Sequence, residues 1–101
     1  MKMIATINPE EVESLLKEGK SLNLIDVREL DEWESGHIKE ARFLPLSELE
    51  ARLGELDKNE EYIMVCRSGG RSGRACEYMQ ALGYKVTNMT GGMLQWQGEV
   101  E

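Results

Sequence analysis

The strongest constraint on the fold of this chain is the alternation of short apolar runs with segments of helical periodicity. Apolar runs predict strands at residues 22–27, 41–44, 62–65 and 85–88. Apolar residues at helical spacing, often behind a capping residue, precede the first of these runs and separate the last three, whereas residues 28–40 form a polar segment rich in acids. Strands that alternate with helices of about ten residues indicate βαβ units. We therefore expect an α/β fold with a mainly parallel sheet and helices on both faces.

Capping signals predict where several of the helices begin. Asn8 and Glu11 have the spacing of a capping box, and Ser47 and Glu50 repeat it farther along the chain. Ser72 is the candidate cap of the helix that follows the strand at 62–65.

Length and composition favour one domain in a reducing compartment. The 101 residues, 41% of them hydrophobic, suffice for one core but not for two, so we expect a single domain over residues 1–101. No run approaches the roughly 20 apolar residues of a membrane span, and acids follow the first residues too closely for a signal peptide. Two cysteines are too few for a disulfide framework. We expect a cytoplasmic protein with free thiols.

Charge is distributed unevenly along the chain. The 19 acidic and 12 basic residues give a net charge of -7, which argues against nucleic acid and anionic membranes as partners. The stretch between Cys66 and Cys76 nevertheless contains Arg67, Arg71 and Arg74 and no acid. This pattern predicts a local anion site in an acidic protein.

Cys66 lies where a predicted strand meets a glycine-bearing loop and the start of a helix. Unpaired helix amides, the positive end of the helix dipole and the flanking arginines all favour a thiolate there. Gly69 and Gly70 permit the positive φ angles that turn successive amides towards an anion. Such a loop fits a thiolate, a persulfide anion or a bound oxyanion. A buried structural cysteine is the alternative interpretation.

Three motifs, in this order, resemble those of the rhodanese homology family. Residues 26–41 contain Asp-Val-Arg-Glu, Glu-Trp and Gly-His-Ile, with an alanine beyond. Residues 66–72 read Cys-Arg-Ser-Gly-Gly-Arg-Ser, which resembles the active-site loop of the family. Residues 91–96 contain Gly-Gly-Met and a tryptophan, which resemble its C-terminal signature. The resemblance extends over nearly the whole chain and implies a five-stranded parallel sheet flanked by helices.

The resemblance also implies a thiosulfate sulfurtransferase with a persulfide on Cys66. A donor such as thiosulfate gives its outer sulfur to Cys66, sulfite leaves, and cyanide or a thiol accepts the sulfur. The implied substrate-binding residues form the loop after the cysteine, with the two arginines on the sulfonate oxygens: Arg67, Ser68, Gly69, Gly70, Arg71 and Ser72. Asp26 and Arg28 are expected to support this loop from a neighbouring strand end. For Arg28, a solvated ion pair is the alternative.

Neither a metal nor another cofactor is expected. His37 is the only histidine and no C-x-x-C pair is present, so a zinc site has too few ligands. We interpret His37 as structural, with a catalytic pairing to Cys66 as the alternative. Cys76 is interpreted as a semi-buried packing residue, and the alternative is that it resolves a persulfide on Cys66.

Two other functions are compatible with parts of the pattern. A cysteine phosphatase or arsenate reductase uses a similar oxyanion loop, but the tyrosine-phosphatase type has five residues between cysteine and arginine, whereas four separate Cys66 from Arg71. A persulfide relay module fed by a partner protein would need the same loop. The expected partners are therefore a small sulfur donor and a thiol or cyanide acceptor, with a sulfur-relay protein as the other option.

Overall fold

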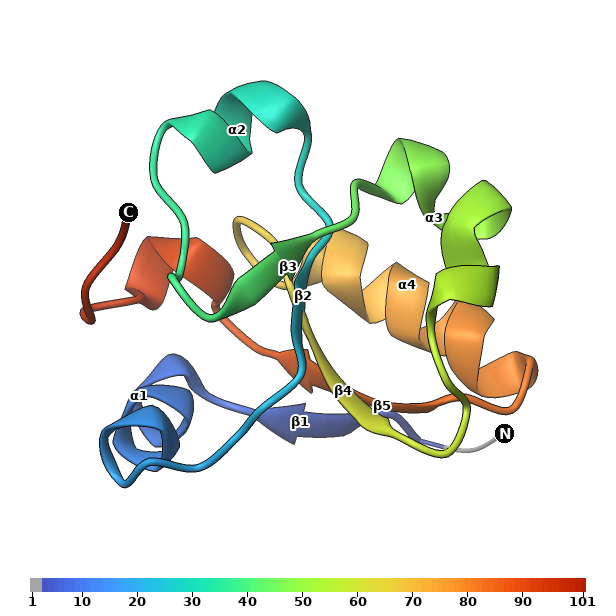
Figure 1. Ribbon diagram of the computed structural model, residues 1–101, viewed down its shortest axis with the longest axis horizontal. Helices are drawn as coiled ribbons and strands as arrows, with labels where there is room; N and C mark the ends of the chain where they lie inside the picture. Colours follow the sequence, from blue (N-terminus) through green and yellow to red (C-terminus); the bar gives the residue numbers. More distant parts are fainter. Residues whose placement is uncertain (1–2) are drawn as a thin grey trace.

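Within residues 3–101, which the computed structural model describes, parallel strands form a sheet at the centre of the protein (Figure 1). The strands are β1 (Ala5–Ile7), β2 (Leu24–Asp26), β3 (Ala41–Phe43), β4 (Glu61–Val65) and β5 (Lys85–Met89). They lie in the order β1-β5-β4-β2-β3, and each described pairing is parallel. The predicted α/β fold with a five-stranded parallel sheet is confirmed.

The strand β1 is the one that apolar periodicity did not predict. It pairs with β5 from Ala5 opposite Thr87 to Ile7 opposite Met89. Its three residues contain a single large aliphatic side chain, so the segment carries little strand signal by itself. Pairing with β5 stabilises it instead.

Helices flank the sheet on both faces (Figure 1). They are α1 (Pro9–Lys17), α2 (Leu30–Glu34), α3 (Leu46–Arg52) and α4 (Gly70–Ala81), with the 3-10 turns η1 (Leu53–Glu55) and η2 (Gly92–Gln95). The predicted capping box of α1 is confirmed, because the Glu11 amide donates to Asn8 Oδ1 at 2.8 Å and the Asn8 amide donates to Glu11 Oε1 at 3.3 Å. In the described part of the chain, no helix is long and apolar enough to cross a membrane.

The caps predicted at Ser47 and Ser72 were wrong. Helix α3 already begins at Leu46, whose amide donates to the carbonyl of Val27 at 2.9 Å, and Ser47 Oγ donates to a Glu29 carboxylate oxygen at 2.9 Å. Helix α4 begins at Gly70, so Ser72 lies in its first turn. Tertiary partners for these two hydroxyls replace the local capping bonds that the spacing suggested.

The sheet separates two apolar clusters because neighbouring strand residues point to opposite faces. Ile25 and Met64 pack on the face covered by α3 and α4. Leu24 and Val65 pack on the other face, together with Val12 of α1. Both faces of the central strands are therefore buried.

The buried face of α4 is rotated from the one that the spacing of its apolar residues predicts, which consists of Ala75, Tyr78, Met79 and Leu82. The residues buried at helical spacing are Ser72, Ala75, Cys76 and Met79. Tyr78, predicted to be on this face, is 40% exposed, whereas Cys76 is fully buried rather than semi-buried. The buried face includes Ser72 because its hydroxyl finds partners inside the protein. That contact could not be seen in the apolar pattern.

The sheet topology brings two predicted site segments to one edge. β2 and β4 are neighbours, with Asp26 opposite Val65 in the register. The Val27 amide donates to the Val65 carbonyl at 2.8 Å, which aligns the two strand ends. Arg28 and Cys66 consequently follow adjacent strands at the carboxyl edge of the sheet, where α/β folds place their sites.

Replacing Met64 by alanine should destabilise the protein strongly. Met64 is fully buried in the central strand, and its truncation leaves a cavity, so we expect a loss of about 2 to 5 kcal/mol in the free energy of unfolding. Met3→Ala is the matched control, because Met3 is 91% exposed and should change stability by about 0.5 kcal/mol or less. Urea unfolding measures both. Equal losses would contradict this description of the core.

Candidate active site

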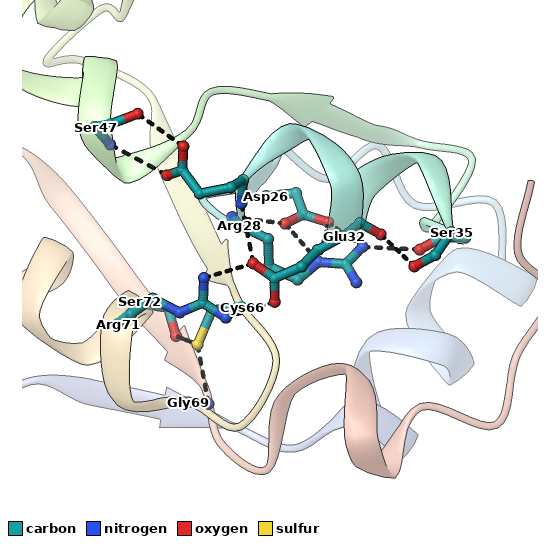
Figure 2. A network of polar contacts seen from close by, with 11 residues as sticks. Asp26, Arg28, Glu32, Ser35, Ser47, Cys66, Gly69, Arg71 and Ser72 are labelled. Atoms are coloured by element: carbon teal, nitrogen blue, oxygen red, sulfur yellow. Dashed lines mark hydrogen bonds and ion pairs between the residues drawn. The ribbon is translucent and has the colours of Figure 1, made fainter.

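The sulfur of Cys66 accepts hydrogen bonds from the loop that follows it. Cys66 comes directly after β4 and is 1% exposed. Its Sγ accepts from the Gly69 amide at 3.0 Å and from the Ser72 hydroxyl at 3.2 Å (Figure 2). Gly69 has a φ of 99°, which only glycine adopts without strain, and this turn directs its amide to the sulfur.

These donors favour the anionic form of the sulfur. Burial raises the pKa of the Cys66 thiol, but hydrogen bonds from the Ser72 hydroxyl and from the amides of Ser72, Gly69 and Ser68 outweigh burial and hold the pKa below its ordinary value. The predicted thiolate-stabilising loop is therefore present. Its main contributors are hydrogen-bond donors rather than the arginine charges that the sequence also suggested.

Asn88 is a member of this network that the sequence analysis missed. Its side chain extends from β5, where Oδ1 accepts from the Ser72 hydroxyl at 2.5 Å and Nδ2 donates to the Gly69 carbonyl at 3.1 Å. The Ser72 hydroxyl has one hydrogen and two acceptors, Asn88 Oδ1 and Cys66 Sγ, so it can donate to only one of them at a time. The available signal in the sequence was a polar residue within a predicted strand.

The C-terminal Gly-Gly-Met motif fixes the first residues of the loop. The Met93 amide donates to the Cys66 carbonyl and the Leu94 amide to the Arg67 carbonyl, both at 2.9 Å. Gly92 has a φ of 56°, and a Cβ at this position would overlap both carbonyl groups. The motif therefore permits a close approach between η2 and the loop that no larger residue allows.

Arg71 forms a two-pronged ion pair with Glu32 of α2. Its Nη1 and Nη2 donate to the two carboxylate oxygens, each at 2.7 Å (Figure 2). This hydrogen bonding, against the opposing effect of burial, lowers the pKa of Glu32 to about 2. Glu32 was noted only as part of a motif, without a role. The pair joins α2 to the first turn of α4.

Arg67, Ser68 and Gly70 lie on the outer side of the loop and are exposed. Within residues 3–101, the Arg67 guanidinium has no ion-pair partner. Of the predicted loop residues, Gly69 and Ser72 donate hydrogen bonds to the sulfur, whereas the side chains of Arg67 and Ser68 face solvent.

Asp26 and Arg28 form a buried ion pair. Arg28 Nη2 donates to Asp26 Oδ2 at 2.9 Å and to the Gly36 carbonyl at 2.8 Å. Asp26 is 0% and Arg28 5% exposed, so the alternative of a solvated pair was wrong. Among the described residues, neither side chain has a hydrogen bond to the 66–72 loop. Their bonds instead fix the 26–36 segment that carries Glu32.

His37 and Cys76 do not contact the Cys66 sulfur through a hydrogen bond in the described residues. The His37 ring stacks on Trp33 with centroids 3.5 Å apart, and its Nδ1 lies 2.9 Å from the Trp33 carbonyl oxygen. Burial and the nearby Cys66 charge raise the pKa of Cys76 to about 12, so its thiol stays protonated. Both side chains are engaged by packing.

A family comparison matches the fold and this loop. The sequence profile described as rhodanese-like domain matches residues 8–99. The chain belongs to the rhodanese-like domain family. YtwF of Bacillus subtilis, named as a proposed sulfurtransferase, is 36% identical over 97% of this chain and 95% of that protein. A sulfurtransferase of Allochromatium vinosum is 34% identical over 93% of this chain and 89% of that protein.

Solved structures agree with this assignment. The crystal structure of a rhodanese-like domain protein from Staphylococcus aureus has 34% sequence identity and a TM-score of 0.90, with 97% of each chain covered. In this rhodanese-like fold, the segments that follow β2 and β4 lie at the same carboxyl edge of the sheet.

Removing the Ser72 hydroxyl from this rhodanese-like domain should raise the pKa of Cys66. Ser72→Ala deletes a donor to the anionic sulfur, and such a bond contributes about 1.5 to 3 kcal/mol, or about 1 to 2 pKa units. The rate of Cys66 alkylation by iodoacetamide is followed by peptide mass at a series of pH values. The midpoint of this pH profile should shift to higher pH. Ser68→Ala is the control, because its exposed side chain has no bond to the sulfur. An unchanged or lower midpoint for Ser72→Ala would show that the hydroxyl does not stabilise the thiolate.

Gly92→Ala should destabilise the domain by about 1 to 3 kcal/mol, because it combines backbone strain with overlap at the loop carbonyls. Gly54→Ala is the matched control, since nothing lies within 4 Å of its added Cβ. Denaturant unfolding compares the two. If both variants unfold at the same urea concentration, the close approach of η2 is not required.

Proposed function

We propose that this protein is a sulfurtransferase that carries sulfane sulfur as a persulfide on Cys66. The proposal is carried by one observation, the donation from the Gly69 amide and the Ser72 hydroxyl to a buried Cys66 sulfur whose pKa is lowered. Donors in these positions favour negative charge on sulfur, both on the attacking thiolate and on the persulfide that follows.

The first half-reaction loads the cysteine. With thiosulfate as donor, the Cys66 thiolate attacks the outer sulfur, a new sulfur–sulfur bond forms, and the bond within thiosulfate breaks with its electron pair leaving on sulfite. No oxidant or reductant is consumed. The negative charge on the sulfur of Cys66 passes to the terminal sulfur of the persulfide.

The second half-reaction returns the enzyme to its starting state. Cyanide or a thiolate attacks the terminal sulfur, the persulfide bond breaks, and the electron pair returns to Cys66 as a thiolate. The products are thiocyanate or a new persulfide, respectively. Both half-reactions balance in charge and atoms.

We assign donor binding to the loop around the cysteine. The exposed Arg67 guanidinium and the loop amides from Ser68 to Ser72 supply N–H groups for an anionic donor. Arg71 contributes N–H groups beside its ion pair. The Asp26–Arg28 pair keeps the segment carrying Glu32 in place next to this loop.

We also propose a cytoplasmic location, because free thiols at Cys66 and Cys76 are maintained in a reducing compartment. A protein-fed persulfide relay would use the same cysteine. The two functions differ in whether a free small molecule can load the sulfur.

Sulfur loading should depend on Cys66 and not on Cys76. Intact-protein mass after incubation with thiosulfate should show the gain of one sulfur atom, which cyanide removes as thiocyanate. Cys66→Ser should abolish this gain, since it removes the accepting sulfur. Cys76→Ser should retain it, because Cys76 is buried and holds its proton.

Equal loading of the Cys66→Ser protein would refute the proposed mechanism. Folded, reduced wild-type protein that gains sulfur only from a partner protein would instead be a relay module. Hydrolysis of an aryl phosphate without sulfur loading would assign the loop to the phosphatase class.

A further inference from the structure

The arginine that ends the Cys66 loop is already neutralised by a carboxylate of the chain itself. The Glu32 oxygens accept hydrogen bonds from both terminal nitrogens of Arg71 at 2.7 Å, and both side chains are partly buried. Arg71 keeps three further N–H groups, so it can still donate hydrogen bonds to a substrate. Its positive charge, however, is offset before a substrate arrives.

Glu32 is held in this position by a second contact. Its Oε1 also accepts the Glu29 amide at 3.1 Å in the capping box of α2, and Glu29 is in turn bonded to Ser47. An incoming anion would have to displace a carboxylate that is fixed on two sides. Exchange of Glu32 for a substrate oxyanion is therefore disfavoured.

The pair lies within electrostatic reach of the reacting sulfur. Arg71 lies in the first turn of α4 beside Ser72, whose hydroxyl is 3.2 Å from the Cys66 sulfur, and charge on Cys66 is among the causes that raise the pKa of Arg71. The lowered pKa of Glu32 keeps its carboxylate charged throughout the pH range of a sulfur-transfer assay. A donor at Cys66 therefore encounters one fixed negative charge behind Arg71.

The negative charge of Glu32 repels some sulfur donors more strongly than others. Thiosulfate is a dianion whose sulfonate oxygens must approach the arginines, so it experiences the Glu32 charge most strongly. A thiol persulfide, R–S–SH, has no sulfonate and carries at most one negative charge on its reacting group. The exposed Arg67 remains as the unpaired cation of the loop, which is not enough to offset a dianion and a thiolate together.

We propose that Glu32 is a specificity-determining residue that disfavours thiosulfate and directs this site towards low-molecular-mass thiol persulfides as donors. This inference rests on the proposed persulfide chemistry of Cys66. The Cys66 thiolate attacks the terminal sulfur of R–S–SH, a bond from Sγ to that sulfur forms, and the donor sulfur–sulfur bond breaks. The electron pair leaves on R–S⁻, the proton stays on the transferred sulfur, and no other reactant is needed.

The test compares two donors with one set of variants. Single-turnover loading of Cys66 is followed by intact mass, with thiosulfate and with the persulfide of 2-mercaptoethanol, which carries no other charged group. Glu32→Gln keeps the size and hydrogen-bonding oxygen of the side chain but removes its charge. The ratio of the thiosulfate rate to the persulfide rate should rise about tenfold, equivalent to about 1.4 kcal/mol.

Two control variants distinguish an effect of the Glu32 charge on the donor ratio from an effect of altered structure. Glu34→Gln removes an exposed acid from the same helix, without an ion-pair partner among residues 3–101, and should leave the ratio unchanged. Glu32→Asp keeps the charge and should retain the wild-type ratio even if it loosens the pair. Thermal unfolding of each variant verifies that it is folded.

The outcomes are distinguishable. Loading of the wild-type protein with an unchanged donor ratio in Glu32→Gln would overturn the role of Glu32 and leave the persulfide mechanism intact. The same ratio change in Glu32→Asp and Glu32→Gln would also overturn it, since charge would not be the cause. Failure of wild-type Cys66 to load from either donor would refute the proposed function as well.

Discussion

Hydrogen bonds from the first turn of α4 to the sulfur of Cys66 connect the fold to the chemistry. They require β4 to end at Val65 in the middle of the sheet and α4 to begin five residues later, at Gly70. The Gly69 turn directs its amide towards the sulfur, and Ser72 extends its hydroxyl from the first turn of α4. Burial alone would make this thiol inert. Donors arranged by the backbone reverse that effect, and the surrounding elements keep the donors in place.

Support for this arrangement comes from three segments that are distant in sequence. Asn88 of β5 binds both Ser72 and the Gly69 carbonyl, and η2 binds the carbonyls of Cys66 and Arg67. Glu32 of α2 binds Arg71 on the other side. The loop therefore has little freedom to rearrange around a substrate. Discrimination between donors must come from charge and access more than from adaptation.

Apolar patterning identified most of the fold, and the reasons for its failures are local. β1 was missed because its signal is weak without β5, and the α4 face was misjudged because it includes the polar Ser72. Cys66 and its loop could be predicted because the signal is contiguous: an apolar strand, a cysteine and glycines that permit unusual φ angles. The roles of Glu32, Asn88 and Gly92 could not be predicted. Each depends on a contact between two elements, and sequence periodicity does not indicate which elements are in contact.

The sheet order also determines when this site can form during synthesis. Among the described strands, β1 is synthesised before the others, yet its only pairing there is with β5, which is synthesised after them. Closing so long a loop is entropically costly and slow compared with local helix formation. Asn88 and Gly92 arrive with the same C-terminal segment. The Cys66 loop therefore gains these supporting contacts only after β5 and η2 have been synthesised.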